Sequence, residues 1–277
     1  MTATAELTEI SPDLTALRTL VVLPTLDERA NIEEVLHRVR SALPNAHVLV
    51  VDDGSTDGTP ELAEAVALAL GQIDVLRRTG ARGLGPAYRA GFGIGLSERF
   101  DVLVEMDADL SHDPSDLPAL VAAVERGADL AVGSRYVPGG DTPGWSARRR
   151  LLSRAGGWYA RSLLRLPVRD VTSGYRAYRA SLLRAIDLDT VTTTGYGFQI
   201  DMTDRARRLG AVIAEVPIVF RDRAAGESKM SAAIIREALA MVTRRALQHV
   251  VGSRRGSRGD RRSDHEGMVL HSVVGRS

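Results

Sequence analysis

The sequence contains no cysteine, which excludes disulfide bonds, thiolate metal sites and a cysteine nucleophile. It has no uninterrupted run of the roughly 18 to 20 apolar residues that a membrane-spanning helix needs, so any work on a lipid is expected from the membrane surface. A charge excess is also missing, because 36 basic and 35 acidic side chains give a formal net charge of +1. No whole-molecule field therefore favours nucleic acid as a partner.

The 277 residues, of which 44% are hydrophobic, are enough for a globular core with flanking segments. Residues 1–18 are polar and carry acids where a signal peptide needs basic residues, so they predict a flexible extension. From Gly252 the chain runs into RRGSRGDRRSD, which has no periodic apolar face and predicts a disordered basic tail over 252–277. The globular domain is expected at 19–230, with a helix at 231–251.

Short apolar runs rich in branched residues alternate with amphipathic helical patterns. The predicted strands are 19–24, 47–52, 73–76, 102–106, 129–132 and 211–220; the predicted helices are 30–42, 59–70, 85–99, 114–126, 147–166 and 198–209. This order predicts an α/β fold, a Rossmann-like, mainly parallel sheet flanked by helices. Ligands of such sheets bind beyond the carboxyl ends of the strands, where the polar clusters PTLDE, DDGSTDGT and DADLSH lie.

The stretch VEMDADLSHDP gathers acids directly after an apolar run. Asp107 and Asp109 have D-x-D spacing, which in an extended segment places both side chains on one side. Oxygen ligands without clustered histidine or cysteine suit a hard divalent cation, Mg²⁺ or Mn²⁺, which keeps waters and bridges a diphosphate. The alternative is a capped loop in which Asp113 or Ser115 starts the next helix.

The loop DDGSTDGT, residues 52–59, combines acids, glycines and hydroxyls that suit hydrogen bonds to a base or ribose. An ordinary Asp/Gly turn is the alternative. PTLDE is expected on the adjacent strand, so the two loops together would grip one nucleotide. The glycine-rich stretch 79–95 opens a helix whose amides could face phosphate. Its glycines follow the third strand and so do not form the dinucleotide fingerprint.

Arginines gather around the loops after the fifth predicted strand. They include Arg135 in GSRY, Arg148 to Arg150 at the start of the next helix, and those of FRDRAAGESKMS. Planar guanidinium groups hold phosphate oxygens in a fork, so the cluster predicts an anionic acceptor. The alternative is an ordinary solvated basic face.

The segment SAAIIREALAMVTRRALQHVV, residues 231–251, has apolar side chains at helical spacing and arginines elsewhere on the helix, among them Arg244 and Arg245. A basic amphipathic helix of this kind can lie in an anionic membrane interface. It can equally pack its apolar stripe on the globular domain. Both interpretations remain open from the sequence.

The ordered motifs PTLDE, DDGSTDGT, GLGPAYRAGF, MDADLSHDP, GSRY, DVTSGYRAY, GYGFQID and FRDRAAGESKMS extend from about Leu20 to Ser231. In this order they resemble the polyprenol-phosphate (dolichol-phosphate) mannose synthases, within the inverting family 2 glycosyltransferases. The resemblance implies a GT-A fold, a GDP-mannose donor, a divalent cation and a polyprenyl or dolichyl monophosphate acceptor.

The resemblance also implies roles for single residues. The implied donor contacts are Pro24, Thr25, Glu28, Asp53, Ser55 and Asp107. The implied cation ligands are Asp107 and Asp109, with Ser111 standing where some relatives have glutamine. The implied acceptor-phosphate contacts are Arg135, Arg149 and Ser153, with Ser228 and Lys229 in a mobile acceptor loop. Asp107, Asp109 and Arg135 are the expected catalytic set, and Asp201 stands where relatives often have glutamate.

A phosphate monoester is largely ionised near neutral pH, since its second pKa is about 6, so no strong general base is expected. One displacement would then invert the anomeric centre. Two alternatives remain: transfer of glucose or another sugar from a UDP-sugar, and a nucleotide-binding module without catalysis. The expected location is the cytoplasm, peripheral at the inner face of the membrane, reached directly or through a separate membrane-protein tether.

Overall fold

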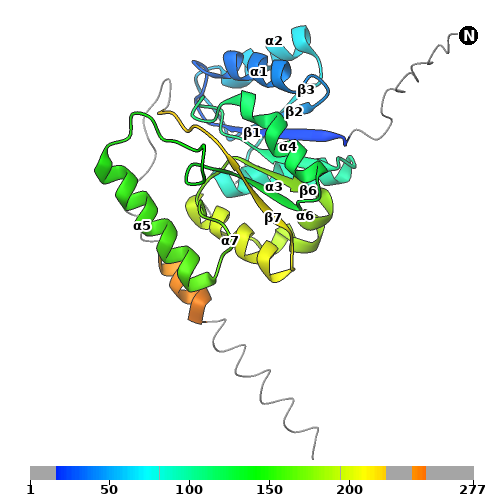
Figure 1. The fold of residues 1–277 in the computed structure, drawn as a ribbon. Coiled ribbons are helices and arrows are strands. Elements are labelled where there is room, and N and C mark those ends of the chain that lie inside the picture. Colours follow the sequence, from blue (N-terminus) through cyan, green and yellow to red (C-terminus); the bar gives the residue numbers. More distant parts are fainter. Residues whose placement is uncertain (1–16, 81, 194, 223–238, 248–277) are drawn as a thin grey trace, which may run out of the picture.

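The computed structural model describes residues 17–80, 82–193, 195–222 and 239–247. Within them lies one seven-stranded sheet in the order β3-β2-β1-β4-β6-β5-β7 (Figure 1). The strands are β1 Thr19–Thr25, β2 His47–Asp52, β3 Ile73–Arg77, β4 Val102–Glu105, β5 Leu130–Ser134, β6 Arg176–Arg179 and β7 Ile213–Pro217. All strand pairs are parallel except those of β6, which runs antiparallel to both β4 and β5.

Helices cover both faces of the sheet (Figure 1). They are α1 Ile32–Ala42, α2 Thr59–Leu70, α3 Leu84–Ser97, α4 Leu117–Glu125, α5 Ala147–Leu164, α6 Ala180–Ile186 and α7 Gly195–Arg208. Successive side chains of a strand point to opposite faces, so Leu20 and Val22 pack with α3 and α7. Val21 and Leu23 pack with α1, α2 and α4 on the other face. The strands read as continuous apolar runs because both faces are buried.

The predicted fold class is confirmed, and most predicted elements agree with the structure to within two or three residues. The range predicted for β2 and that for α2 match their bounds. Two elements were missed, β6 and α6, which follow one another along the chain. Because β6 pairs between β4 and β5, it brings the segment before it, 169–175, to the carboxyl edge of the parallel strands.

Residues 239–247 are helical and pack against the globular domain. Met241 and Val242 are buried in the core shared with α5 and α7. Arg245, predicted on the outer surface of this helix, instead lies 2.6 Å from the buried carboxylate of Asp201. This part of the predicted 231–251 helix therefore follows the packing interpretation, and its remaining residues lie outside those described. No helix in the described ranges is long and apolar enough to cross a bilayer.

Candidate functional site

The D-x-D pair lies directly beyond β4 at the carboxyl edge of the sheet. Asp107 is partly exposed, whereas Asp109 is only 4% exposed and accepts a hydrogen bond from the Ser111 amide at 3.0 Å. Leu110, directly after Asp109, has φ +62°, a left-handed conformation that bulky residues rarely adopt. Such strain persists only where the surroundings enforce it and is common at functional sites. The capped-loop alternative also holds in part, because Asp113 accepts from the Ser115 amide at 3.0 Å.

His112 holds the backbone of the D-x-D segment in place. Its Nδ1 accepts a hydrogen bond from the Asp107 amide at 3.2 Å, and its ring stacks on Tyr175 with 4.8 Å between centroids. Burial, together with the Arg135 guanidinium nearby, lowers the pKa of His112 to about 4. A neutral ring that accepts at Nδ1 has a structural role here, so His112 is not counted among the cation ligands.

The oxygen atoms around the D-x-D pair fit a hard divalent cation. Ser111 Oγ is buried and has no hydrogen-bond partner in the described part of the chain, so it is available as a third oxygen beside Asp109. Within the residues that the structure describes, no group of three His, Cys, Asp or Glu side chains could hold a metal by itself. A cation at this position would depend on waters and substrate phosphates for its other ligands, as Mg²⁺ commonly does.

The loops after β1 and β2 are joined into one surface by reciprocal hydrogen bonds. The Asp27 amide donates to Ser55 Oγ at 2.9 Å, and the Thr56 amide donates to Asp27 Oδ1 at 2.8 Å. Thr25 Oγ1 donates to Asp52 Oδ1 at 3.1 Å beneath them. The structure thus brings the predicted donor residues Thr25 and Ser55 together through Asp52, an acid of the predicted nucleotide loop whose bonds to these two hydroxyls were not predicted.

The other predicted donor residues border the same surface. Asp53 accepts from the Gly83 amide at 2.7 Å and forms an ion pair with Arg78, which ties the β2 loop to the start of α3. Glu28 is partly exposed and accepts from the Asn31 side chain at 2.9 Å. Pro24 is partly buried in β1. The two loops therefore form one polar edge next to the strand that carries the D-x-D pair, as adjacency of their strands predicted.

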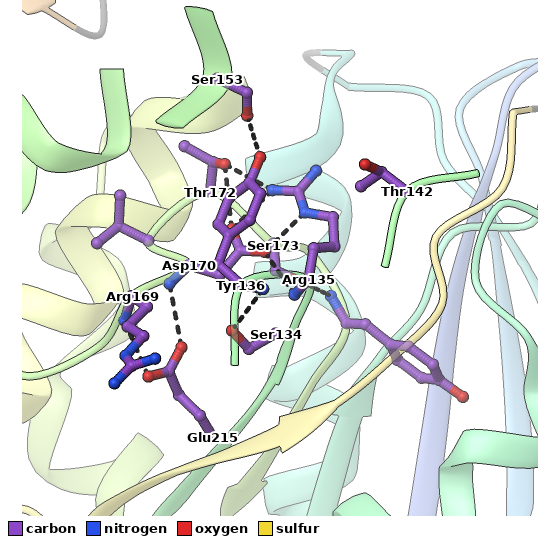
Figure 2. Close-up of polar contacts among 12 residues, drawn as sticks. Ser134, Arg135, Tyr136, Thr142, Ser153, Arg169, Asp170, Thr172, Ser173 and Glu215 are labelled. Carbon is purple, nitrogen blue, oxygen red and sulfur yellow. Dashed lines mark hydrogen bonds and ion pairs between the residues drawn. The ribbon is translucent and has the colours of Figure 1, made fainter. Parts of the chain in front are cut away.

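Arg135 is the centre of a second cluster, shown in Figure 2. Its Nε and Nη2 both lie 2.6 Å from the carboxylate of Asp170, and Nη2 also donates to Thr172 Oγ1 at 2.9 Å. Asp170 is held in turn by Glu215 of β7, which accepts from the Asp170 amide at 3.1 Å. Burial alone would raise the pKa of Asp170, but the Arg135 guanidinium holds it below its usual range. The pair is buried and charged.

The first turns of α5 reach the same cluster. Ser146 caps the helix by accepting from the Arg149 amide at 3.2 Å. The Arg149 guanidinium lies over the Trp145 ring at 3.9 Å and pairs with Asp222 at 2.6 Å. Tyr136 donates to Ser153 Oγ at 2.6 Å (Figure 2). Three of the predicted acceptor residues are therefore brought together, whereas Ser228 and Lys229 lie outside the described residues.

Phe220 connects the two clusters. Its ring lies 5.4 Å from the His112 ring, 5.6 Å from the Trp145 ring and 5.3 Å from the Arg135 guanidinium carbon. The next residue, Arg221, donates its amide to the Ser111 carbonyl at 3.2 Å. The carboxylate pair and the arginine cluster are thus neighbours on one edge, with aromatic side chains between them.

A buried polar network, not recognised from the sequence, lies beneath the D-x-D pair. Gln199 donates to Glu105 Oε2 at 2.7 Å, and Arg176, opposite Glu105 in the sheet, donates to the Gln199 carbonyl at 2.9 Å. Burial raises the pKa of Glu105 to about 7. The motifs GYGFQID and DVTSGYRAY contain Gln199 and Arg176, so the signal was present without its structural meaning. Asp201 of the first motif is 1% exposed and bonds Arg205 at 2.9 Å, a structural contact.

The raised pKa of Glu105 predicts a specific pH dependence of stability. Between the ordinary pKa of 4.5 and about 7, the folded protein binds more protons at this carboxyl than the unfolded chain does, so its contribution falls as pH rises. The difference corresponds to roughly 3 kcal/mol. Urea unfolding at pH 5 and pH 8 in EDTA is expected to show this loss in the parent chain and not in Glu105→Gln. Equal losses in both proteins would contradict it.

Residues 20–187 match the model of the family described as "Glycosyl transferase family 2". The chain is 52% identical over 231 residues to an undecaprenyl-phosphate mannosyltransferase of Micrococcus luteus, covering 83% of this chain and 95% of that relative. It is 50% identical over 240 residues to a polyprenol monophosphomannose synthase of Mycolicibacterium smegmatis, covering 86% and 91%.

A third relative, a dolichol-phosphate mannosyltransferase of Pyrococcus furiosus, is 36% identical over 82% of this chain and 63% of its own length. Among solved structures, a glucosyl-3-phosphoglycerate synthase of Mycobacterium tuberculosis with Mn²⁺, UDP-glucose and phosphoglyceric acid has a TM-score of 0.62. Its identity to this chain is 26%, over 83% of this chain and 80% of that one. These likenesses agree with the GT-A architecture of the sheet, and the chain belongs to glycosyl transferase family 2.

Proposed function

We propose that the protein transfers mannose from GDP-mannose to a polyprenyl monophosphate, with inversion at the anomeric carbon. One observation carries the proposal: a carboxylate pair suited to a cation and an arginine cluster centred on the buried Arg135 lie side by side at the carboxyl edge of the sheet. The reaction must bring two anionic phosphate compounds together, and this edge offers a place for each. Relatives that are 50% and 52% identical are mannosyl transferases acting on polyprenol-type lipids by their names.

The donor is assigned to the joined loops after β1 and β2. Asp53 and Ser55 would contact the base and ribose, Thr25 and Pro24 line the edge beside them, and Glu28 borders it. The hydrogen bond from the Asp27 amide to Ser55 Oγ holds the two loops together before a ligand binds. A site that needs little reordering retains more of its interaction energy for binding.

Asp107 and Asp109, with Ser111, are assigned to a divalent cation, and a homologous structure contains Mn²⁺. When bound, such a cation neutralises the charge that develops on a leaving diphosphate. The chain itself holds the two aspartates in place. The Ser111 amide donates a hydrogen bond to the Asp109 carboxylate, and the His112 ring accepts one from the Asp107 amide.

The acceptor phosphate is assigned to Arg135, with Arg149 and Ser153 at its border. In the described part of the chain no side chain bonds Arg135 Nη1, because Asp170 and Thr172 engage Nε and Nη2. The guanidinium is therefore held in one orientation with a donor left for phosphate. Since the acceptor is already ionised near neutral pH, catalysis here consists of alignment and electrostatic stabilisation. Ser228 and Lys229 are assigned to the same phosphate from the acceptor loop.

The acceptor lipid places the reaction at a membrane surface, on which the protein would work as a peripheral enzyme at the cytoplasmic face, alone or with a membrane-protein tether. The direct test of function incubates the purified chain with radiolabelled GDP-mannose, a polyprenyl phosphate and Mg²⁺ or Mn²⁺. Label is expected in the organic phase. Labelling from UDP-glucose and not from GDP-mannose would assign the donor to the alternative.

A further inference from the structure

Two glycines allow α3 to lie close to the strands that lead to the D-x-D pair. A Cβ added to Gly91 would overlap Val22 Cγ1 of β1. One added to Gly95 would lie 2.5 Å from Leu103 Cδ2 of β4. Both separations are well below the distance at which carbon atoms make contact, so a side chain at either glycine would force the helix and the sheet apart. In this part of the glycine-rich stretch 79–95, the glycines therefore serve close helix packing.

Tyr88 lies on the side of α3 that faces the sheet. It precedes Gly91 by three residues and Gly95 by seven, a spacing that places all three on one stripe of the helix. The side chain is fully buried, and its hydroxyl donates to Asp107 Oδ1 at 3.4 Å. A phenol is protonated near neutral pH and can donate in this way. The close packing of α3 thus brings a hydrogen-bond donor to one carboxylate of the D-x-D pair.

Two aromatic rings hold the ring of Tyr88 in place. Its centroid lies 5.9 Å from that of Phe92 and 6.0 Å from that of Phe198, with interplanar angles of 23° and 15°. Stacked rings at these distances attract one another. Phe198 belongs to α7, which packs in the same core cluster as α3 (Figure 1). Because a densely packed core leaves little room for a buried ring to turn, the hydroxyl is kept in one position before any ligand binds.

Asp107 is therefore held at two points, since His112 accepts from its amide at 3.2 Å and Tyr88 donates to its carboxylate. Groups that hydrogen-bond a metal ligand orient it and tune its affinity for the metal. We infer that Tyr88 is a positioning residue, whose hydroxyl orients the Asp107 carboxylate for the divalent cation. The inference rests on the cation assignment of the proposed function, because it concerns one of the assigned ligands.

Tyr88→Phe tests the inference, because it keeps the stacked ring and removes the donor. Binding of Mn²⁺ to the full chain in the presence of GDP, followed by the electron paramagnetic resonance signal of free Mn²⁺, is expected to weaken by about tenfold. The matched control is Tyr159→Phe on α5, which also loses a bonded hydroxyl, 2.8 Å from Thr243 Oγ1. This control is expected to bind Mn²⁺ like the parent. Equal affinity in Tyr88→Phe and the parent chain would overturn the inference.

Transfer kinetics distinguish a positioning role from a purely structural one. For Tyr88→Phe the KM for Mn²⁺ is expected to rise by about tenfold, while kcat at saturating Mn²⁺ stays within about threefold of the parent, because the bound cation then holds the carboxylate itself. Urea unfolding in EDTA checks that the variant is folded. A lower kcat with an unchanged KM for Mn²⁺ would assign Tyr88 to the fold alone and overturn the inference.

The glycine contact supplies a second test that leaves Tyr88 intact. Gly91→Ala is expected to weaken Mn²⁺ binding by about tenfold, because the added methyl overlaps Val22 and moves α3 away from the sheet. Gly91→Ala/Val22→Ala is expected to restore the affinity, since the Val22 Cβ that remains lies 3.4 Å from the added carbon. The matched control is Gly93→Ala on the same helix, where an added Cβ meets no atom of the described chain within 4 Å. Parent-like Mn²⁺ binding by a folded Gly91→Ala would overturn the link between helix packing and the carboxylate.

The binding assay also separates this inference from the proposed function, because Mn²⁺ and GDP bind without any sugar or lipid. Weaker Mn²⁺ binding by Tyr88→Phe, with no mannose transfer by the parent chain, would overturn the function and leave the positioning role standing. Transfer by the parent chain, with equal Mn²⁺ affinity in Tyr88→Phe, would overturn the positioning role and leave the function standing. A parent chain that does not bind Mn²⁺ would overturn both.

Discussion

Replacing Asp109 by asparagine is expected to lower kcat/KM for sugar transfer by about a thousandfold, because the variant removes a charge that the proposed cation needs. The amide keeps the volume of the carboxylate and can still accept from Ser111, whose amide lies 3.0 Å from Asp109 Oδ1. The fold should therefore survive. Initial rates with radiolabelled donor, at saturating Mg²⁺ or Mn²⁺, measure the loss, and circular dichroism checks the fold.

Asp74→Asn is the matched control for this substitution. Asp74 is an exposed carboxylate of β3 that pairs with His47 at 2.6 Å, at the opposite edge of the sheet from β5 and β7. The transfer rate of Asp74→Asn is expected within about twofold of the parent rate, since exposed ion pairs contribute little to stability. A rate for Asp109→Asn within tenfold of the parent would contradict the role assigned to the D-x-D pair.

The second large effect is expected at the buried Arg135–Asp170 pair. Asp170→Leu leaves the Arg135 guanidinium buried without its partner, which costs about 3–5 kcal/mol of unfolding free energy. Arg135→Met/Asp170→Leu removes both charges and is expected to regain most of that stability. Neither variant should transfer sugar, because the donor group for the acceptor phosphate is displaced or absent. Urea unfolding and the transfer assay measure the two effects separately.

This pair of variants distinguishes a structural from a functional role. If the double variant recovers both stability and transfer, Arg135 serves the fold alone and the acceptor site lies elsewhere. If stability recovers while transfer stays absent and donor binding is unchanged, the guanidinium is needed for the acceptor. Calorimetric titration with GDP provides the donor-binding measurement, since the carboxylate of Asp170 bonds Arg135 and Thr172, away from the β1 and β2 loops.

The parallel half of the sheet was predictable because its strands are buried on both faces and flanked by helices whose apolar residues recur at helical spacing. β6 was not, because RAYR is short and polar at both ends. Arg176 belongs in a strand only because its side chain can reach the Gln199 and Val171 carbonyls inside the fold. Such pairing between distant segments is a tertiary effect that local pattern does not contain.

The site, like the fold, was predictable in part. The residue types at strand ends predicted where ligands would meet the sheet, and the D-x-D spacing predicted a cation. The partner of Arg135 was not predictable, since Asp170 is 35 residues further along the chain and no spacing rule links them. Asp27 and Asp52 lie in the loops that were predicted to hold the nucleotide. Their hydrogen bonds from one loop to the other were not predicted, because these form only when β1 and β2 are side by side.

The most direct measurement is a crystal structure of the chain with GDP and Mn²⁺, with anomalous data collected at the manganese edge. The account predicts a manganese peak between the carboxylates of Asp107 and Asp109, with the diphosphate bound to it and the guanidinium of Arg135 facing the same cavity. A peak bound by other residues, with the diphosphate distant from Asp107, would contradict it.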